Sequence, residues 1–163
     1  MAKALIRVGH GVDVHAFGPG DGFMLAGVRI ASDTAVVGHS DGDVVFHALT
    51  DAFLGAVGAG DLGSMFGVDR PEFKDAPSEM FLREALACVR AKQLAAAHVD
   101  VTVLTQKPKL SPYRDAMRQN LSDSIGLDRD DVSVKFTSTD TLGLIGRGEG
   151  IAAFAVVGLA ARV

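Results

Sequence analysis

Two potential metal ligands lie two residues apart in an apolar segment near the N-terminus. The segment VGHGVDVHAF, residues 8–17, has the character of a β-strand, in which alternate side chains point to the same face. Asp13 and His15 therefore project from one face, and Gly9 and Gly11 leave space beside them. A carboxylate and an imidazole in this arrangement are typical ligands of zinc. The spacing predicts half of a metal site.

A third ligand is required, because catalytic zinc commonly takes three protein ligands and keeps a fourth position for water or substrate. His47 is the best candidate, since it lies on the polar side of a predicted helix over 43–57. Asp43 and Asp51 lie one turn away on either side, and we expect one of them to hydrogen-bond the ring nitrogen that the metal does not use. The alternative is that His15 and His47 are ordinary half-buried histidines.

A glycine-bounded loop, VGHSDGD, runs into the start of this helix. Free backbone N–H groups and the helix dipole favour an anion such as phosphate at such a position. Ser40 and Asp41 are also typical N-cap residues, and capping is the commoner role of these side chains. The loop by itself leaves both roles open.

Two later segments, TQKPKLSPY and KFTSTDTLGLIGRGEG, carry further polar candidates. Mg²⁺ is usually held by one or two carboxylates together with substrate phosphates, so a lone aspartate among hydroxyl groups is compatible with it. The cationic candidates are Lys107, Lys109 and Arg147, the hydroxyl donors are Thr137, Ser138 and Thr139, and Asp140 is the ligand for a hard cation.

Composition narrows the class of protein around these residues. A chain of 163 residues with 48% hydrophobic content predicts one globular domain over residues 1–163. The net charge of -4 argues against a nucleic-acid surface, which would show a basic stripe. Cys88 is the only cysteine, and no apolar run reaches the roughly 18 residues that span a bilayer. We therefore expect a cytoplasmic protein with neither nucleic-acid nor membrane partners.

Periodicity predicts an α+β fold, a mixed β-sheet with helices packed on one face, in the order ββααβαββ. The first two strands are expected to pair antiparallel, and residues 64–77 are expected to form a loop. Ser78 is the expected cap of the second helix, and Ser111-Pro112 and Gly126 are expected to bound the third. The expected strands cover about 4–15, 23–30, 98–106, 132–139 and 150–163, and the helices 43–57, 79–93 and 112–126.

Four long motifs carry a resemblance to a known family: GHGVDVHAF, GHSDGDVVFHALTDAFLGAVGAGDLG, VDVTVLTQKPKLSPY and TLGLIGRGEGIAA. From about Ile6 to the C-terminus the chain resembles the 2-C-methyl-D-erythritol 2,4-cyclodiphosphate synthases of the non-mevalonate isoprenoid pathway. The resemblance implies a phosphorus–oxygen lyase that forms a homotrimer with its active sites between subunits. It also implies conversion of 4-diphosphocytidyl-2-C-methyl-D-erythritol 2-phosphate to the cyclic diphosphate and CMP, with Zn²⁺ and Mg²⁺ or Mn²⁺ as cofactors.

Transferred by position, the resemblance implies a role for each candidate residue. The zinc ligands, which also contact substrate, are Asp13, His15 and His47, the same three that the spacing predicts. His39 and Ser40 form a phosphate-binding loop, Asp61 and Gly63 contact the erythritol hydroxyls, and Phe66 is a further substrate-binding residue. The cytidine pocket of the neighbouring subunit includes Thr105, Lys109 and Leu110, and Thr137, Ser138, Thr139 and Asp140 bind the diphosphate and Mg²⁺. Leu144 and Arg147 lie near the trimer axis, and the implied catalytic residues are His39, Lys109, Ser138 and Asp140.

Several positions depart from the family pattern. Val68 and Arg70, in the segment GVDRP, replace residues that are usually acidic. Asp140 replaces a glutamate and Ser138 a threonine, while Leu144 replaces an aromatic residue that would favour an isoprenoid ligand on the axis. Two other functions fit the same residues: a zinc-dependent phosphohydrolase, and a non-catalytic nucleotide-binding trimer in which the metal is structural.

Overall fold

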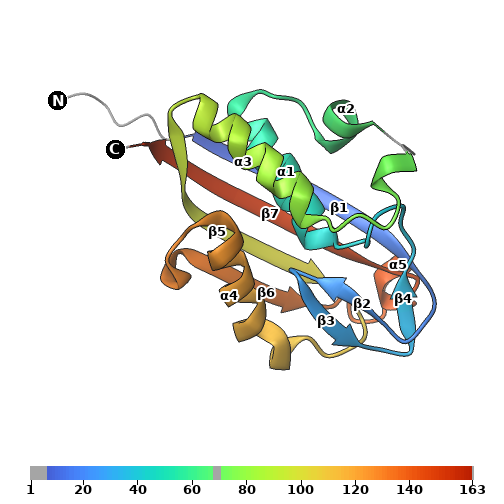
Figure 1. The fold of residues 1–163 in the computed structure, drawn as a ribbon. Coiled ribbons are helices and arrows are strands. Elements are labelled where there is room, and N and C mark those ends of the chain that lie inside the picture. Colours follow the sequence, from blue (N-terminus) through green and yellow to red (C-terminus); the bar gives the residue numbers. More distant parts are fainter. Residues whose placement is uncertain (1–6, 68–70, 163) are drawn as a thin grey trace.

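A five-stranded sheet is the frame of the fold (Figure 1). The computed structural model describes residues 7–67 and 71–162. Strands β5 and β6 are parallel and the other neighbours are antiparallel, which confirms the predicted mixed sheet. In spatial order the strands are β4 (Thr34–Val36), β1 (Arg7–Pro19), β7 (Gly150–Ala161), β5 (Leu94–Leu104) and β6 (Val132–Thr137).

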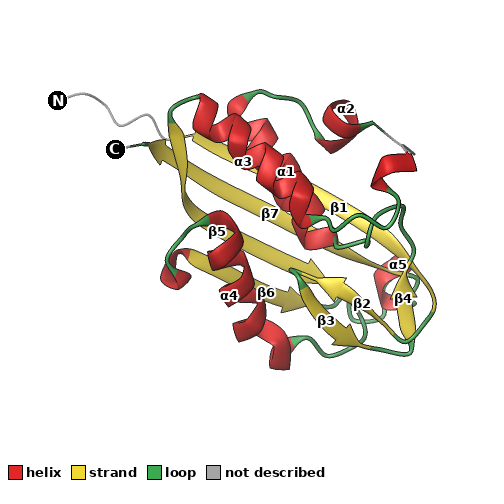
Figure 2. Cartoon of the chain, in the orientation of Figure 1, coloured by secondary structure: helices red, strands yellow, loops and turns green. Residues whose placement is uncertain are grey.

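Three helices cover one face of this sheet, so the predicted α+β class is confirmed (Figure 2). Helix α1 lies over β1 and β7, α3 over β5, and α4 over β6. Short turns of 3₁₀ helix lie at Pro71–Phe73, Ser111–Tyr113 and Arg129–Asp131. No helix in the described part of the chain is long and apolar enough to cross a membrane. The helices are α1 (Val44–Val57), α2 (Leu62–Phe66), α3 (Glu79–Ala91), α4 (Arg114–Ile125) and α5 (Gly143–Gly146).

The pairing predicted for the first two strands is wrong. Strand β1 pairs with β7 and β4, whereas the segment after it folds on itself as a separate hairpin of β2 (Gly22–Leu25) and β3 (Val28–Ala31). Ala26 and Gly27 both have left-handed backbone at the turn, the geometry of a two-residue hairpin. The turn pairs β2 with β3, and neither of them pairs with β1.

Three other element predictions need correction. The first strand runs to Pro19, and residues 4–6 of its predicted range lie outside the described residues. The predicted loop over 64–77 contains the end of α2 and a 3₁₀ turn. The predicted end of the third helix is confirmed, because Gly126 ends α4 in left-handed conformation. Its predicted start at Ser111-Pro112 is instead a 3₁₀ turn, and α4 begins at Arg114.

The N-cap of α1 is Asp43, and neither Ser40 nor Asp41 caps this helix. The Asp43 side chain is fully buried and accepts hydrogen bonds from the backbone N–H groups of Val45 and Phe46. Sequence reasoning placed Asp43 on the polar face of the helix, one position too far inside it.

Gly9 and Gly11 allow α1 to lie directly against β1. A Cβ atom at Gly9 would overlap the carbonyl oxygen of Ala52, and one at Gly11 would overlap that of Ala48. Backbone atoms cannot move aside as a flexible side chain can. The two glycines therefore set the distance between the strand that carries Asp13 and the helix that carries His47.

We expect Gly9→Ala to lower the free energy of unfolding by about 3 kcal/mol, the upper part of the usual range for overpacking. Gly55→Ala is the matched control, because a Cβ there meets nothing within 4 Å. Since alanine is the better helix former, this control should raise stability by about 0.5–1 kcal/mol. Urea unfolding measures both, and a neutral Gly9→Ala would contradict the close contact.

Candidate metal centre

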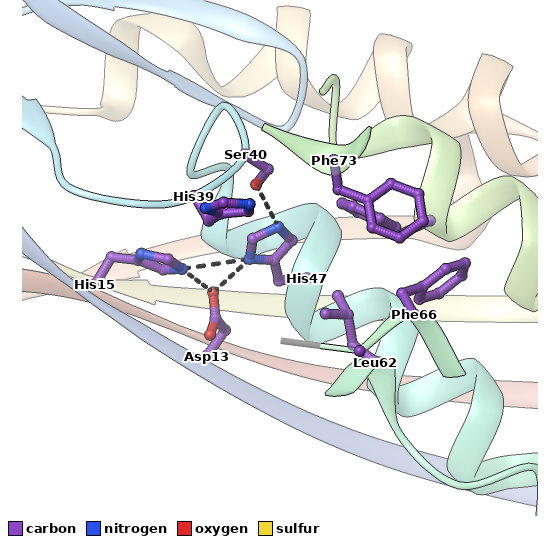
Figure 3. A pocket seen from close by; sticks show the side chains of 10 residues that line it. Asp13, His15, His39, Ser40, His47, Leu62, Phe66 and Phe73 are labelled. Atoms are coloured by element: carbon purple, nitrogen blue, oxygen red, sulfur yellow. Dashed lines mark hydrogen bonds and ion pairs between the residues drawn. The ribbon is translucent and has the colours of Figure 1, made fainter. Parts of the chain in front are cut away.

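Three side chains from two elements bring one ligand atom each to a common point (Figure 3). Oδ2 of Asp13 lies 3.0 Å from Nε2 of His15 and 3.0 Å from Nδ1 of His47, and the two nitrogens are 3.3 Å apart. Ligands of tetrahedral zinc with bonds of 2.0–2.1 Å are separated by roughly 3.3 Å. The triad predicted from spacing therefore has the dimensions of a zinc site.

The hydrogen bonds around the two rings orient their lone pairs toward this point. Nδ1 of His15 donates to the carbonyl oxygen of Val37 at 2.8 Å, so the lone pair of the neutral ring is on Nε2. On the far side of His47, Nε2 lies 2.9 Å from the Ser78 hydroxyl and 3.0 Å from the Ser40 hydroxyl. A carboxylate and two imidazoles that converge in this way fit a divalent cation.

The same contacts shift the pKa values of Asp13 and His15. Burial opposes ionisation of Asp13, but hydrogen bonds and charge interactions with His15 and His47 outweigh it and hold the Asp13 pKa well below its usual range. The hydrogen bond to Asp13 raises the pKa of His15, against the effect of burial. The ionised carboxylate thus favours positive charge at this point, whether a proton or a metal supplies it.

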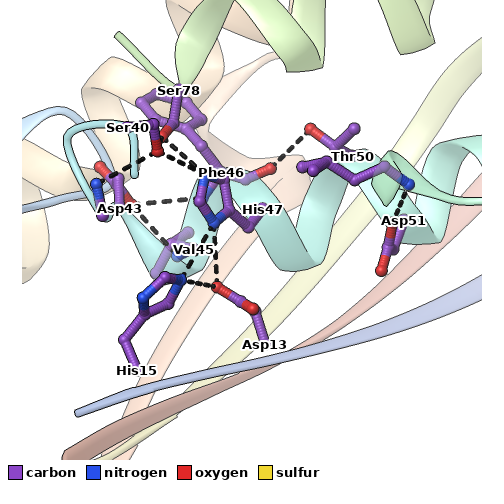
Figure 4. A network of polar contacts seen from close by, with 12 residues as sticks. Asp13, His15, Ser40, Asp43, Val45, Phe46, His47, Thr50, Asp51 and Ser78 are labelled. Carbon is purple, nitrogen blue, oxygen red and sulfur yellow. Dashed lines mark hydrogen bonds and ion pairs between the residues drawn. The ribbon is translucent and has the colours of Figure 1, made fainter. Parts of the chain in front are cut away.

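The partner predicted for the outer nitrogen of His47 is wrong. Neither Asp43 nor Asp51 reaches it (Figure 4). Asp43 is occupied by backbone amides, and Asp51 accepts a hydrogen bond of 2.7 Å from the N–H of Leu62. The hydroxyl groups of Ser40 and Ser78 take the predicted place.

A pocket of about 220 Å³ opens beside the triad, and one of its walls is aromatic. His39, Ser40 and Phe66 line it, so three more of the predicted site residues lie with the triad. The rings of Phe66 and Phe81 are 4.8 Å apart and those of Phe73 and Phe81 are 5.4 Å apart. Sequence reasoning missed Leu62, Phe73 and Phe81 as pocket residues, although it placed Phe81 on the apolar face of its helix.

Asp61 and Gly63 flank the pocket without lining it. Asp61 is the N-cap of α2, and its carboxylate accepts a hydrogen bond of 2.7 Å from the N–H of Ser64. Leu62, between the two predicted residues, does line the pocket. The two residues therefore lie at its edge, where the turn into α2 is tied to Asp51.

The remaining predicted residues gather elsewhere on the described part of the chain. A second hollow contains Thr105, Lys109, Leu110, Thr137 and Ser138, and it shares no lining residue with the pocket of the triad. Within a single chain the structure thus forms two separate groups of predicted site residues.

The last four candidates follow β6 in the chain: Thr139 and Asp140 lie in the turn, Leu144 in α5 and Arg147 directly after it. Asp140 has left-handed backbone and accepts a hydrogen bond of 3.2 Å from Ser138, and Thr139 lies between them. Leu144 is exposed, and Arg147 forms a bidentate ion pair with Glu149. In the single chain Asp140, Leu144 and Arg147 are exposed, whereas Thr139 is half-buried and its hydroxyl donates to the carbonyl of Leu142. The departures at Val68 and Arg70 lie outside the described residues.

Comparison with known proteins agrees with this geometry. The YgbB family matches residues 6–160. The 2-C-methyl-D-erythritol 2,4-cyclodiphosphate synthase of Ectopseudomonas mendocina is 48% identical over 93% of this chain and 96% of its own length. The bifunctional enzyme IspD/IspF of Caulobacter vibrioides is 50% identical over 93% of this chain, and the chain spans only 40% of that relative.

Solved structures agree as well. The CDP complex of Plasmodium falciparum IspF superposes with a TM-score of 0.85 at 34% identity and covers 97% of both chains. The bifunctional IspDF of Campylobacter jejuni has a TM-score of 0.93 at 40% identity, over 98% of this chain and 43% of its own. These matches confirm the resemblance expected from the sequence, and the chain belongs to the YgbB family, the family of the cyclodiphosphate synthases that it matches.

Proposed function

We propose that residues 1–163 form one domain that converts 4-diphosphocytidyl-2-C-methyl-D-erythritol 2-phosphate to 2-C-methyl-D-erythritol 2,4-cyclodiphosphate and CMP. The convergence of Asp13, His15 and His47 beside a pocket is the observation that carries this proposal. A relative 48% identical over nearly its full length has the name of this activity. The enzyme is a phosphorus–oxygen lyase, and because a chain with one cysteine forms no intrachain disulfide, we place it in the cytoplasm.

The reaction requires positioning more than a strong base. The attacking 2-phosphate has a second pKa of about 6, so it is largely an oxyanion at neutral pH. Asp13, His15 and His47 would hold a zinc ion, which would supply Lewis-acid polarisation of a phosphate oxygen. His39 and Ser40 orient that phosphate from the loop before α1, and ring closure within one molecule makes orientation effective.

The aromatic wall favours cyclisation over hydrolysis. Phe66, Phe73 and Phe81 cover one side of the pocket with apolar surface, which disfavours a water molecule beside the reacting phosphate. A zinc phosphohydrolase would instead need an ordered water at this place. The wall therefore supports the lyase over the hydrolase.

We infer that the second hollow completes the site from a neighbouring subunit of a homotrimer. Thr105, Lys109 and Leu110 would hold the cytidine. The Lys109 ammonium would neutralise charge on the leaving CMP, and the Ser138 hydroxyl would donate a hydrogen bond to it. The face of the sheet away from the helices supports this assembly, because it exposes Val8 and other large apolar side chains. In this assembly Leu144 and Arg147 lie near the axis, and Thr137, Thr139 and Asp140 with Mg²⁺ or Mn²⁺ bind the diphosphate.

Phosphorus NMR tests the proposal directly. Purified protein with Zn²⁺ and Mg²⁺ is incubated with the diphosphocytidyl substrate, and we expect the cyclic diphosphate and CMP in equal amounts. A linear phosphate product would instead establish a hydrolase. Tight CDP binding without turnover would favour a nucleotide-binding module.

Asp140→Ala tests the Mg²⁺ assignment. Since it removes the only carboxylate proposed for this ion, we expect the half-maximal Mg²⁺ concentration to rise about tenfold, the loss of roughly 1.4 kcal/mol of binding, while zinc content stays unchanged. Asp130→Ala is the control, because that side chain is fully solvent-exposed in another turn. An unchanged Mg²⁺ titration would remove Asp140 from the site.

A further inference from the structure

Ser78 occupies the N-cap position of α3, yet its hydroxyl group makes no capping hydrogen bond. The residue is completely buried, and its Oγ atom lies 2.9 Å from Nε2 of His47 (Figure 4). The same hydroxyl donates a short hydrogen bond to Oδ1 of Asp41. A serine that any sequence pattern would assign to helix capping is thus turned toward the back of a metal ligand.

The count of protons determines which atom donates to which. A hydroxyl group has one proton, and Ser78 gives it to the carboxylate of Asp41. Its oxygen therefore presents a lone pair to His47, and a second lone pair on Nε2 at 2.9 Å would be repelled. The Ser78 hydroxyl therefore favours a proton on Nε2, the tautomer that leaves the Nδ1 lone pair for a metal. When no cation is bound, Nδ1 instead lies 3.0 Å from the Asp13 carboxylate, which also accepts a proton.

Ser40 does not make this choice. Its Oγ atom lies 3.0 Å from Nε2 of His47 and 3.2 Å from Oγ of Ser78. Its proton can point to the Ser78 oxygen while Ser40 accepts from a protonated Nε2, or it can point to an unprotonated Nε2. On this side of the ring, the preference for a proton on Nε2 therefore comes from Ser78 and from the Asp41 carboxylate behind it.

Backbone hydrogen bonds hold this carboxylate and hydroxyl together. Oδ2 of Asp41 accepts from the N–H of Ser78 at 3.1 Å, and the N–H of Asp41 donates to the carbonyl of Ala76 at 3.1 Å. The N–H of Asp75 donates to the carbonyl of His39 at 2.9 Å. The loop before α1 and the start of α3 are thus joined along their length, and Ser78 has little freedom to turn away.

We propose that Asp41 and Ser78 are positioning residues that set the tautomer and ring orientation of His47 and thereby raise the zinc affinity of the site. Neither belongs to the triad, and neither lines the pocket beside it. The inference rests on the metal centre of the proposed function but not on its reaction.

Zinc affinity, measured by competition with a chromophoric chelator, is the first test. Loss of an orienting partner of a metal-bound histidine typically costs 10–100-fold in affinity, and we expect this loss for Ser78→Ala. Ser122→Ala is the matched control. Ser122, in α4, is also buried, and its hydroxyl donates to the carbonyl of Leu127 just after the helix. Ser78→Thr, which keeps the hydroxyl, should recover part of the affinity. Equal zinc binding by Ser78→Ala and Ser122→Ala would overturn the proposal.

The role of Asp41 is tested by a double-mutant cycle. If Asp41 acts through Ser78, Asp41→Asn weakens zinc binding in the wild type but has little further effect in Ser78→Ala. Full additivity of the two losses would show that Asp41 acts independently and would remove it from the proposal.

Proton and nitrogen-15 NMR of the zinc-loaded protein provides a readout besides activity. We expect a slowly exchanging Nε2–H of His47, held by its hydrogen bond to Ser78, and faster exchange of this proton in Ser78→Ala than in Ser122→Ala. Equal exchange in the two variants would overturn the inference, whatever the activity. Conversely, Ser78-dependent zinc binding without formation of the cyclic product would leave the inference intact and refute only the proposed function.

Discussion

Replacement of His47 by alanine is expected to remove zinc binding and turnover together while the chain stays folded. The substitution removes one of three ligands and leaves Asp13 and His15 with an incomplete set. A Lewis-acid metal supplies several kcal/mol of transition-state stabilisation, so turnover should fall by roughly 10³-fold. Lost packing against Phe81, whose ring centre is 5.9 Å away, costs about 1 kcal/mol of stability.

His98→Ala is the matched control for this experiment, since His98 is exposed on β5 away from the triad. Zinc content, turnover and the urea midpoint are measured for both variants. We expect the control to keep its zinc and its activity. Full activity of metal-free His47→Ala would exclude His47 from the mechanism, and equal loss in the control would show a general effect of removing histidine.

Replacement of Asp43 by alanine is expected to cause the largest loss of stability. The carboxylate is fully buried and accepts four backbone hydrogen bonds at 2.8–3.2 Å. Two come from the first turn of α1, and two from Ala26 and Gly27 in the hairpin turn. Loss of the cap and of acceptors for two more amides should lower the free energy of unfolding by about 3–5 kcal/mol.

Asp130→Ala controls for the loss of an aspartate, because Asp130 is fully exposed and should change stability by less than about 0.5 kcal/mol. Asp43→Asn should lie between the two, since its amide keeps one acceptor oxygen. Denaturant unfolding at constant zinc concentration measures all three. A loss below about 1 kcal/mol in Asp43→Ala would show that water replaces the carboxylate.

The candidate metal-binding triad illustrates what local periodicity predicts well. Asp13 and His15 share a face because strand side chains alternate, and His47 faces them from the polar side of an amphipathic helix. Both arguments use only neighbouring residues, and the structure confirms both. The convergence of strand and helix then follows from glycines that allow close contact.

The hydrogen-bond partner of Nε2 of His47 could not be predicted by the same reasoning. Helical spacing predicted Asp43 or Asp51 as the partner of Nε2, because spacing relates His47 only to residues one turn away on the same helix. Ser78 is 31 residues away and reaches His47 only because α3 packs beside α1. The pairing of β1 is a similar case. Its partners are β4 and β7, whereas β2 and β3, which follow it directly in the sequence, pair with each other.

The sequence by itself determined the fold class, the family and the candidate metal-binding triad, because these depend on local periodicity and on long motifs. Only the tertiary structure decided which groups orient the ligands, which phenylalanines form the pocket wall and which strands pair. Each of these contacts joins residues far apart in the chain. Periodicity describes only residues that are close in sequence, so it cannot predict which distant side chains will pack together.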